Sequence, residues 1–420
     1  MRSSLPISLG FAASPLLAAV DAVFLGQMGV DALAIGGYCT SVLFFMGAIG
    51  RHSTSSLAPL IAASLNHPLD QSRWIASGLG VSIILGVIFL AFMQLFALPL
   101  VALGLEARLQ PAGLEFFRIS TFSIIPTLIF YLLRHGLEAR GRGKETMLLG
   151  FALVAIRAVA NTAALSLGQG ASAIAWGMVI SEILGAFGAW WLARGAFETK
   201  LGQLSRLFSV HSAQEIWRIG FPTGLLAAAE YGAFLLVGVI CAQTGALGMA
   251  AHSIALNLTA LSFVFPMGIG QAAAIGIARC QNNTSRLNVI KSSSWLAFAL
   301  SLILGIIIFL GRHRIPQLYT SDSQVIALGS QLLVMVSLFQ VADCMQTTVV
   351  GSLRGLFDTK IPALIHMVAW WVVCAPLAWG LGLAAGMGVT GAWLGLAAGM
   401  AFAALAQGLR LAHVIRRRGI

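Results

Sequence analysis

The sequence predicts an all-α polytopic membrane protein with twelve transmembrane helices. Apolar residues make up 58% of the 420 residues, and charged residues only 9%. The apolar residues fall in runs long enough to cross a bilayer as helices, and the charges gather in short segments between the runs. A soluble domain carries roughly a quarter charged residues. An ordinary cytoplasmic enzyme, a disordered chain and a coiled coil are therefore excluded.

The apolar runs give the predicted helices in order. The first six runs cover residues 5–26, 32–65, 76–98, 121–133, 147–167 and 171–193. The second six cover residues 219–242, 249–277, 293–310, 325–353, 361–381 and 389–414. A closed barrel would show alternating segments of about ten residues, so helices are the interpretation that fits. The first run continues through Asp21 with no cleavage site after it, and we interpret it as a span rather than a signal peptide.

The basic residues predict the orientation of the chain. An even number of helices places both ends on one side of the membrane. If that side is the cytoplasm, most Lys and Arg lie in cytoplasmic loops, and Arg51 and Arg157 lie within spans. The external loops then hold only Arg108, Arg118, Arg312 and Arg314. The positive-inside rule therefore predicts that both termini are cytoplasmic. The net charge of +11 reflects this topology, so the expected partner is the lipid bilayer and not a nucleic acid.

The chain also repeats itself. Leu5-Pro6 matches Phe221-Pro222, and residues 27–29 match residues 243–245, both at an offset of about 216 positions. The fourth and tenth runs end alike, with Leu-Glu-Ala-Arg-Gly at residues 137–141 and Leu-Arg-Gly at residues 353–355. Because six is an even number, two such halves enter the membrane with the same orientation and form a parallel repeat.

This repeat predicts two pseudo-symmetric six-helix lobes. We expect an N-lobe at residues 1–197, a cytoplasmic linker at residues 198–215 and a C-lobe at residues 216–420. Two similar lobes around one axis enclose a cleft, and rocking them would alternate access to it. A single chain holds both lobes, so a monomer is expected to suffice.

Ionisable residues within spans are costly in lipid and by default indicate function. Glu230 lies about 18 Å along the seventh run, and Asp343 about 16 Å from the end of the tenth. If they face each other, they form a site for Na⁺ or for a shared proton, because two carboxylates in a low dielectric cannot both stay ionised without a cation. Helical spacing adds Phe339 and Gln346 to the face of Asp343. The alternative is that both acids only form hydrogen bonds with neighbouring groups.

The other buried ionisable residues have competing interpretations. Arg157 could pair with Glu182 from the adjacent helix, and Arg51 could neutralise Asp21. His252, with Asn257 close along the same helix, is either a packing histidine or a proton relay. At the repeat offset Asp21 corresponds to Val237 and Glu230 to Ser14, so the two lobes are expected to do different work.

Several segments resemble the multidrug and toxic compound extrusion (MATE) family, in particular its bacterial NorM-like branch. The matching stretches are VDAVFLGQMG at residues 20–29, AAE at 228–230, GALGMAAHSIALN at 245–257, FPMGIG at 265–270, FQ at 339–340 with Asp343 and Gln346, and LRG at 353–355. The resemblance covers nearly the whole chain and is most specific in its C-terminal half.

The resemblance implies a two-lobed antiporter in the bacterial inner membrane that expels lipophilic or cationic small molecules in exchange for Na⁺ or H⁺. In it, Glu230 and Asp343 match the cation site of the C-lobe, with Na⁺ as a possible metal there. Asp21 matches the coupling acid of the first helix, and Asn161 matches the asparagine beside it. No cofactor other than the coupling ion is implied.

The chain departs from the family pattern at four positions, one of which is Arg51 within the second helix. Leu165 stands where some relatives have a second acid, and Met178 where they have a threonine. Phe339 stands where NorM-like members often have tyrosine, which removes an oxygen ligand from the C-lobe site.

Two other functions remain open. A flippase or exporter of lipid-linked or other metabolites, from the same wider superfamily, would need several inward-facing arginines for a polyanionic substrate, and Arg51 and Arg157 keep it in view. A membrane-embedded enzyme is not expected, since no metal-binding motif or nucleophile with a base in reach is visible, and we assign no catalytic residue. The five cysteines also lack metal-ligand spacing.

Overall fold

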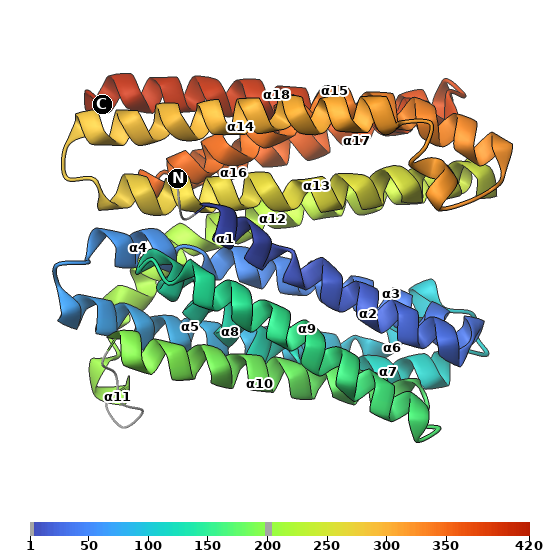
Figure 1. The fold of residues 1–420 in the computed structure, drawn as a ribbon, viewed down its shortest axis with the longest axis horizontal. Helices are drawn as coiled ribbons and strands as arrows, with labels where there is room; N and C mark the ends of the chain where they lie inside the picture. Colours follow the sequence, from blue (N-terminus) through green and yellow to red (C-terminus); the bar gives the residue numbers. More distant parts are fainter. Residues whose placement is uncertain (1–3, 198–203) are drawn as a thin grey trace. The chain divides into compact units, whose positions relative to one another are not determined.

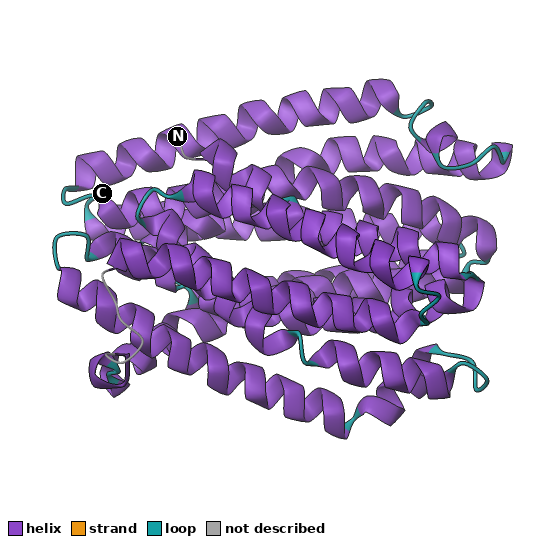
Figure 2. Ribbon diagram, turned by 60° about the horizontal axis from the view of Figure 1, so that its bottom comes forward, coloured by secondary structure: helices purple, strands orange, loops and turns teal. Residues whose placement is uncertain are grey.

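The computed structural model describes residues 4–197 and 204–420, and every regular element in these ranges is helical (Figure 2). It contains 12 helices that are long and apolar enough to cross a membrane, which confirms the predicted fold class. Residues 198–203 of the predicted linker lie outside the described residues.

The chain divides into two compact units, each described here by itself (Figure 1). The N-terminal unit holds Leu9–Gly224, and the C-terminal unit holds Leu225–Ile420 together with the start of the chain up to Ser8. The N-terminal unit contains the last residues of α1 (Ser4–Phe11) and the start of α12 (Val210–Gln243). Between them lie α2 (Ala13–Met28), α3 (Val30–Thr54), α4 (Leu57–Ala63), α5 (Pro68–Leu95), α6 (Ala97–Gly104), α7 (Gln110–Thr121), α8 (Ile124–Ala139), α9 (Gly143–Ser166), α10 (Ala171–Phe197) and the short α11 (Leu204–Leu207).

The C-terminal unit is built around α15, which packs against three other long helices. Its elements are the rest of α12, then α13 (Ala246–Arg279), α14 (Asn283–Gly311), η2 (Pro316–Leu318), α15 (Ser323–Gly355), α16 (Lys360–Met367), the π-helix η3 (Val368–Cys374), α17 (Ala375–Trp379), the π-helix η4 (Gly380–Ala384) and α18 (Gly388–Arg418).

Prolines explain where several spans are interrupted. A proline inside a helix clashes with the carbonyl group four residues earlier and lacks an N–H of its own. Pro15, Pro59 and Pro126 each lie four residues after such a break, at Phe11–Ala12, Ser55–Ser56 and Phe122–Ser123. Pro376 follows the π-helix η3 in the same way. Four spans therefore change direction or helical pitch at positions that the sequence marks.

Many of the basic residues that were expected in loops lie within helices, and three of them show why that expectation was wrong. Arg134 lies in α8, Arg354 in α15 and Arg118 in α7. An apolar run ends at the first charge, but α8 and α15 extend past Arg134 and Arg354 because each of these charges has a partner inside the protein. The buried Arg134 Nε lies 2.7 Å from Glu138 Oε1, and Arg354 Nη2 donates to Gln271 Oε1 at 2.7 Å.

Helices α13 and α15 meet backbone to backbone at Gly270 and Gly351. A Cβ placed on Gly351 would lie 2.2 Å from the carbonyl oxygen of Gly270 and 2.5 Å from its Cα. Neither atom belongs to a side chain that could move aside, so only glycine fits at this crossing.

We expect Gly351→Ala to destabilise the protein strongly, by about 3 kcal/mol, because overpacking against rigid backbone must separate the two helices. The thermal unfolding midpoint of the purified protein in detergent measures this. Gly408→Ala is the matched control, since a Cβ at Gly408 meets nothing within 4 Å. Equal midpoints for the two variants would contradict the close crossing.

Candidate functional site

The N-terminal unit encloses a cavity of about 110 Å³. Helices α2, α3, α8, α9 and α10 all contribute to its wall. Its charged lining residues are two acids and three arginines: Asp21, Glu182, Arg51, Arg134 and Arg157. The remaining wall is mostly apolar, with hydroxyl groups from α2, α3 and α8.

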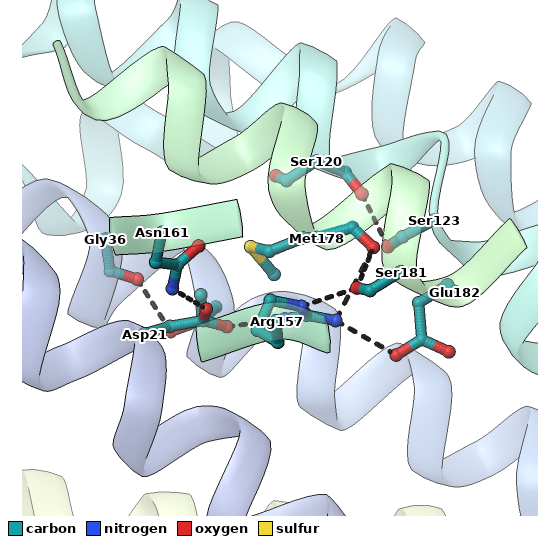
Figure 3. Close-up of polar contacts among 10 residues, drawn as sticks. Asp21, Gly36, Ser120, Ser123, Arg157, Asn161, Met178, Ser181 and Glu182 are labelled. Atoms are coloured by element: carbon teal, nitrogen blue, oxygen red, sulfur yellow. Dashed lines mark hydrogen bonds and ion pairs between the residues drawn. The ribbon is translucent and has the colours of Figure 1, made fainter. Parts of the chain in front are cut away.

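Arg157 of α9 joins the two acids (Figure 3). Its Nη1 lies 2.6 Å from Asp21 Oδ2, and its Nη2 lies 3.2 Å from Glu182 Oε1. Its Nε donates to Ser181 Oγ at 2.5 Å. The side chain is only 3% exposed, and the paired Asp21 side chain 4%. Removing one partner of a buried ion pair is costly, so this network is a fixed part of the unit.

Asp21 has a second partner in Asn161, whose Nδ2 donates to Oδ1 at 2.9 Å. Figure 3 shows both carboxylate oxygens of Asp21 engaged, one by Asn161 and one by Arg157. The hypothesis that Arg51 neutralises Asp21 is therefore wrong, because Arg157 takes that position. The predicted pair of Arg157 with Glu182 is present, but Arg157 bonds to Asp21 as well.

In the C-terminal unit, Glu230 of α12 and Asp343 of α15 lie close enough for their charges to repel. Asp343 is 1% exposed, and neither of its carboxylate oxygens makes a hydrogen bond of normal geometry to the described residues. Gln346, one turn further on, interacts with Asp343, and its own Oε1 has no hydrogen-bond partner there either. Unsatisfied buried carboxylate and amide oxygens are the ligands that a hard cation prefers.

The sequence analysis missed His366 of α16, whose Nε2 lies 3.8 Å from Glu230 Oε2. Gln407 of α18 contacts both the carbonyl oxygen of Pro362, at 2.9 Å, and His366 Nδ1, at 3.0 Å. A carbonyl oxygen can only accept, so the atom facing it is the amide nitrogen, which therefore also donates to Nδ1. A neutral imidazole with its proton on Nε2 would direct that proton at Glu230. The rule that singled out ionisable residues within spans also applies to His366.

The remaining predicted residues lie apart from this pair of acids. Trp393 Nε1 donates to His252 Nδ1 at 3.2 Å, and the two rings meet edge to face, which favours the packing interpretation of His252. Phe339 stacks on the other side of the tryptophan, with ring centroids 5.9 Å apart. Asn257 is exposed and donates to the backbone oxygen of Ser253.

The family model MatE matches this chain twice, over residues 6–162 and 222–379. The two matches begin at Pro6 and Pro222, the prolines whose spacing indicates the repeat.

The chain belongs to the MatE family.

Curated relatives place it in the NorM-like branch. The chain is 30% identical to a probable multidrug resistance protein NorM of Xanthomonas campestris, over 99% of this chain and 93% of that protein. It is 28% identical to the multidrug resistance protein NorM of Burkholderia vietnamiensis, over 97% of this chain and 92% of that protein. The predicted resemblance is thus confirmed.

Solved MATE structures share the fold. A MATE structure in the bent conformation has a TM-score of 0.88 at 17% identity, and covers 100% of this chain and 96% of its own. The eukaryotic MATE transporter AtDTX14 has a TM-score of 0.84 at 16% identity, and covers 100% of this chain and 97% of its own. The chain is therefore a NorM-like MATE transporter with twelve membrane-spanning helices.

The two units of this MATE chain offer different chemistry to a cation. In the N-terminal unit the first-helix acid is already paired with an arginine, and the Met178 position supplies only its backbone oxygen to Arg157, at 3.5 Å. In the C-terminal unit the carboxylate of Asp343 and the amide oxygen of Gln346 have no hydrogen bond of normal geometry to the described residues, and Glu230 lies close to Asp343. Within residues 4–197 and 204–420, no group of three or more His, Cys, Asp and Glu side chains is arranged to hold a metal ion, so a cation at Glu230 and Asp343 would also need neutral oxygens such as Gln346 Oε1.

Proposed function

We propose that this protein exports lipophilic or cationic small molecules from the bacterial cytoplasm in exchange for Na⁺ or H⁺. The observation that carries the proposal is Asp343, a buried carboxylate near Glu230 whose oxygens make no hydrogen bond of normal geometry to the described residues. A buried unpaired charge is expensive unless a cation binds it or a proton neutralises it. Curated relatives named for multidrug resistance support the choice of substrate.

The exchange follows from competition for the pair formed by Glu230 and Asp343. A cation entering from outside neutralises the pair, and its release to the cytoplasm restores the charge. His366 Nε2 lies 3.8 Å from Glu230 Oε2, so a proton on Nε2 would stabilise the ionised Glu230 carboxylate. The driving force is sufficient, since one charge moving across 100 mV is worth about 2.3 kcal/mol.

Asp21, the acid in the N-terminal unit, has a secondary role in the proposed exchange. A cation could reach Asp21 only by displacing Arg157, which is held by four contacts. The same contacts weaken the flippase alternative, because Arg157 is committed to two acids and is not available for a pyrophosphate. The protein acts as a monomer in the inner membrane with both termini in the cytoplasm.

Efflux of ethidium from everted vesicles or intact cells tests the function. We expect efflux from cells that express the chain, driven by an imposed gradient of Na⁺ or of H⁺, and collapse of efflux when that one gradient is removed. Buffers with and without Na⁺, each over a range of pH, identify the ion. Well-expressed protein that moves ethidium under neither gradient would contradict the proposal and favour a metabolite or lipid substrate.

A further inference from the structure

The charges around the N-terminal cavity do not match a site built only for cations. Arg157 is bonded to Asp21 and Glu182. Arg134 is bonded to Glu138 at 2.7 Å and to the carbonyl oxygen of Gly10 at 3.2 Å, and it lies over the ring of Phe11. Four of the five charged lining residues are thus held in ion pairs within the protein.

Arg51 of α3 is the exception. Its side chain makes no ion pair and no hydrogen bond with the residues that the structure describes. Its guanidinium lies over two aromatic rings, 4.9 Å from the centroid of Phe44 and 5.3 Å from that of Tyr131. All three side chains line the cavity.

Stacking on rings uses the flat face of a guanidinium and leaves its edges, which carry the N–H groups, free to donate. The backbone makes room for this arrangement at Gly47, one turn before Arg51. A Cβ on Gly47 would lie 2.8 Å from Arg51 Nη1, so a larger residue would push the guanidinium away. Arg51 is therefore held in place by packing while its hydrogen-bonding edge has no partner.

A preorganised planar donor with no acceptor matches a carboxylate, which a guanidinium can bind through two parallel hydrogen bonds. Phe44 and Tyr131 beside it match an aromatic ring attached to that carboxylate. The volume of about 110 Å³ is enough for a carboxylate and the adjoining ring atoms rather than a whole drug-sized molecule. The cavity also holds two acids, of which Glu182 lies near enough to Arg51 for their charges to attract, and these acids would tolerate a positive group on the same ligand.

We propose that Arg51 forms a carboxylate-binding subsite in the N-terminal cavity and selects aromatic substrates that carry a carboxylate. This rests on the proposed function in one respect, namely that the ligand of the cavity is a transported substrate. The subsite adds an anion-recognition residue to a protein whose other proposed site, at Glu230 and Asp343, takes cations.

Two dyes that differ in a single group test the proposal. Rhodamine B carries a free carboxylate, and its ethyl ester has the same rings without that charge. Binding of each dye to the purified full-length protein is measured by fluorescence polarisation at neutral pH. This assay uses no ion gradient, so its result is separate from whether Na⁺ or H⁺ drives export.

We expect wild-type protein to bind the carboxylate dye more tightly than the ester. Arg51→Gln should lower the ratio of the two affinities about tenfold, since a charge-assisted pair is lost. Arg51→Lys should give an intermediate ratio, because lysine keeps the charge but not the planar fork. Arg118→Gln is the matched control: it removes a positive charge from the same unit but does not line the cavity.

Three results would overturn the subsite. The first is wild-type protein that binds both dyes alike or binds neither. The second is a preference for the carboxylate dye that persists in Arg51→Gln. The third is an equal fall in the ratio for Arg118→Gln, which would indicate a general effect of charge. The unfolding midpoint of each variant shows whether it is folded, and the ester reports binding that does not depend on the carboxylate.

Discussion

Neutralising either acid of the C-terminal pair is expected to abolish ion-driven efflux while leaving the protein folded. Glu230→Gln and Asp343→Asn keep the size of each side chain and remove its charge. The loss of a charged ligand from a buried site costs about 3 kcal/mol or more, so gradient-driven ethidium efflux should fall at least about 100-fold. The measurement is the initial rate of efflux under the gradient that drives the wild type.

The unfolding midpoint separates this effect from simple damage. Neither carboxylate oxygen of Asp343 makes a hydrogen bond of normal geometry to the described residues, so replacing the carboxylate by an uncharged amide removes a destabilising charge. Asp343→Asn should therefore unfold at the wild-type temperature or above it while inactive. Asp70→Asn, at the exposed start of α5, is the matched control and should keep full activity. Full efflux by both C-terminal variants would move the coupling to Asp21.

Removing the guanidinium of Arg157 is expected to produce the largest loss of stability of any single charge in the N-terminal unit. Arg157→Gln leaves two buried carboxylates facing each other without the cation between them. Breaking a buried pair in this way costs about 3–5 kcal/mol. The unfolding midpoint in detergent should fall well below that of Arg312→Gln, which removes a partly exposed arginine that has no ion pair among the described residues and contacts only the backbone oxygen and ring of Phe309.

A double substitution tests the origin of that loss. Asp21→Asn combined with Arg157→Gln removes one acid together with the arginine and should recover part of the stability. If the double variant is as unstable as the sum of its single variants, Arg157 stabilises the unit by packing alone, and the interpretation of the cavity as an ion-pair network fails.

The spans and the repeat could be predicted from the sequence because both are written in local patterns. An apolar run predicts a membrane-spanning helix without any knowledge of the helices that pack against it. The equivalent positions of Pro6 and Pro222 make the repeat recognisable in the sequence. The ends of the helices were harder to predict. Arg134 looks like the end of a span until Glu138, four residues on, is seen to be its partner in a buried pair.

The site was predicted less completely, since its chemistry depends on which helices pack together. Sequence spacing placed Glu230 and Asp343 at similar depth, but could not say that Arg157 from α9 reaches α2 and α10 at once. His366 was missed because neutral histidines do not stand out in a count of charges. Its imidazole contacts Gln407, which lies 41 positions away in the chain, and sequence spacing does not indicate such a contact.

The backbone contact of Gly270 with Gly351 couples α13 and α15 rigidly at their crossing. At most helix interfaces side chains lie between the two backbones, and changes of rotamer let one helix shift slightly without moving the other. Here α15 carries Asp343 two turns before Gly351, and bare backbone meets bare backbone at the crossing. If α15 shifts when Asp343 gains or loses charge, α13 would therefore have to move with it, because no side chain between the two helices can take up the shift.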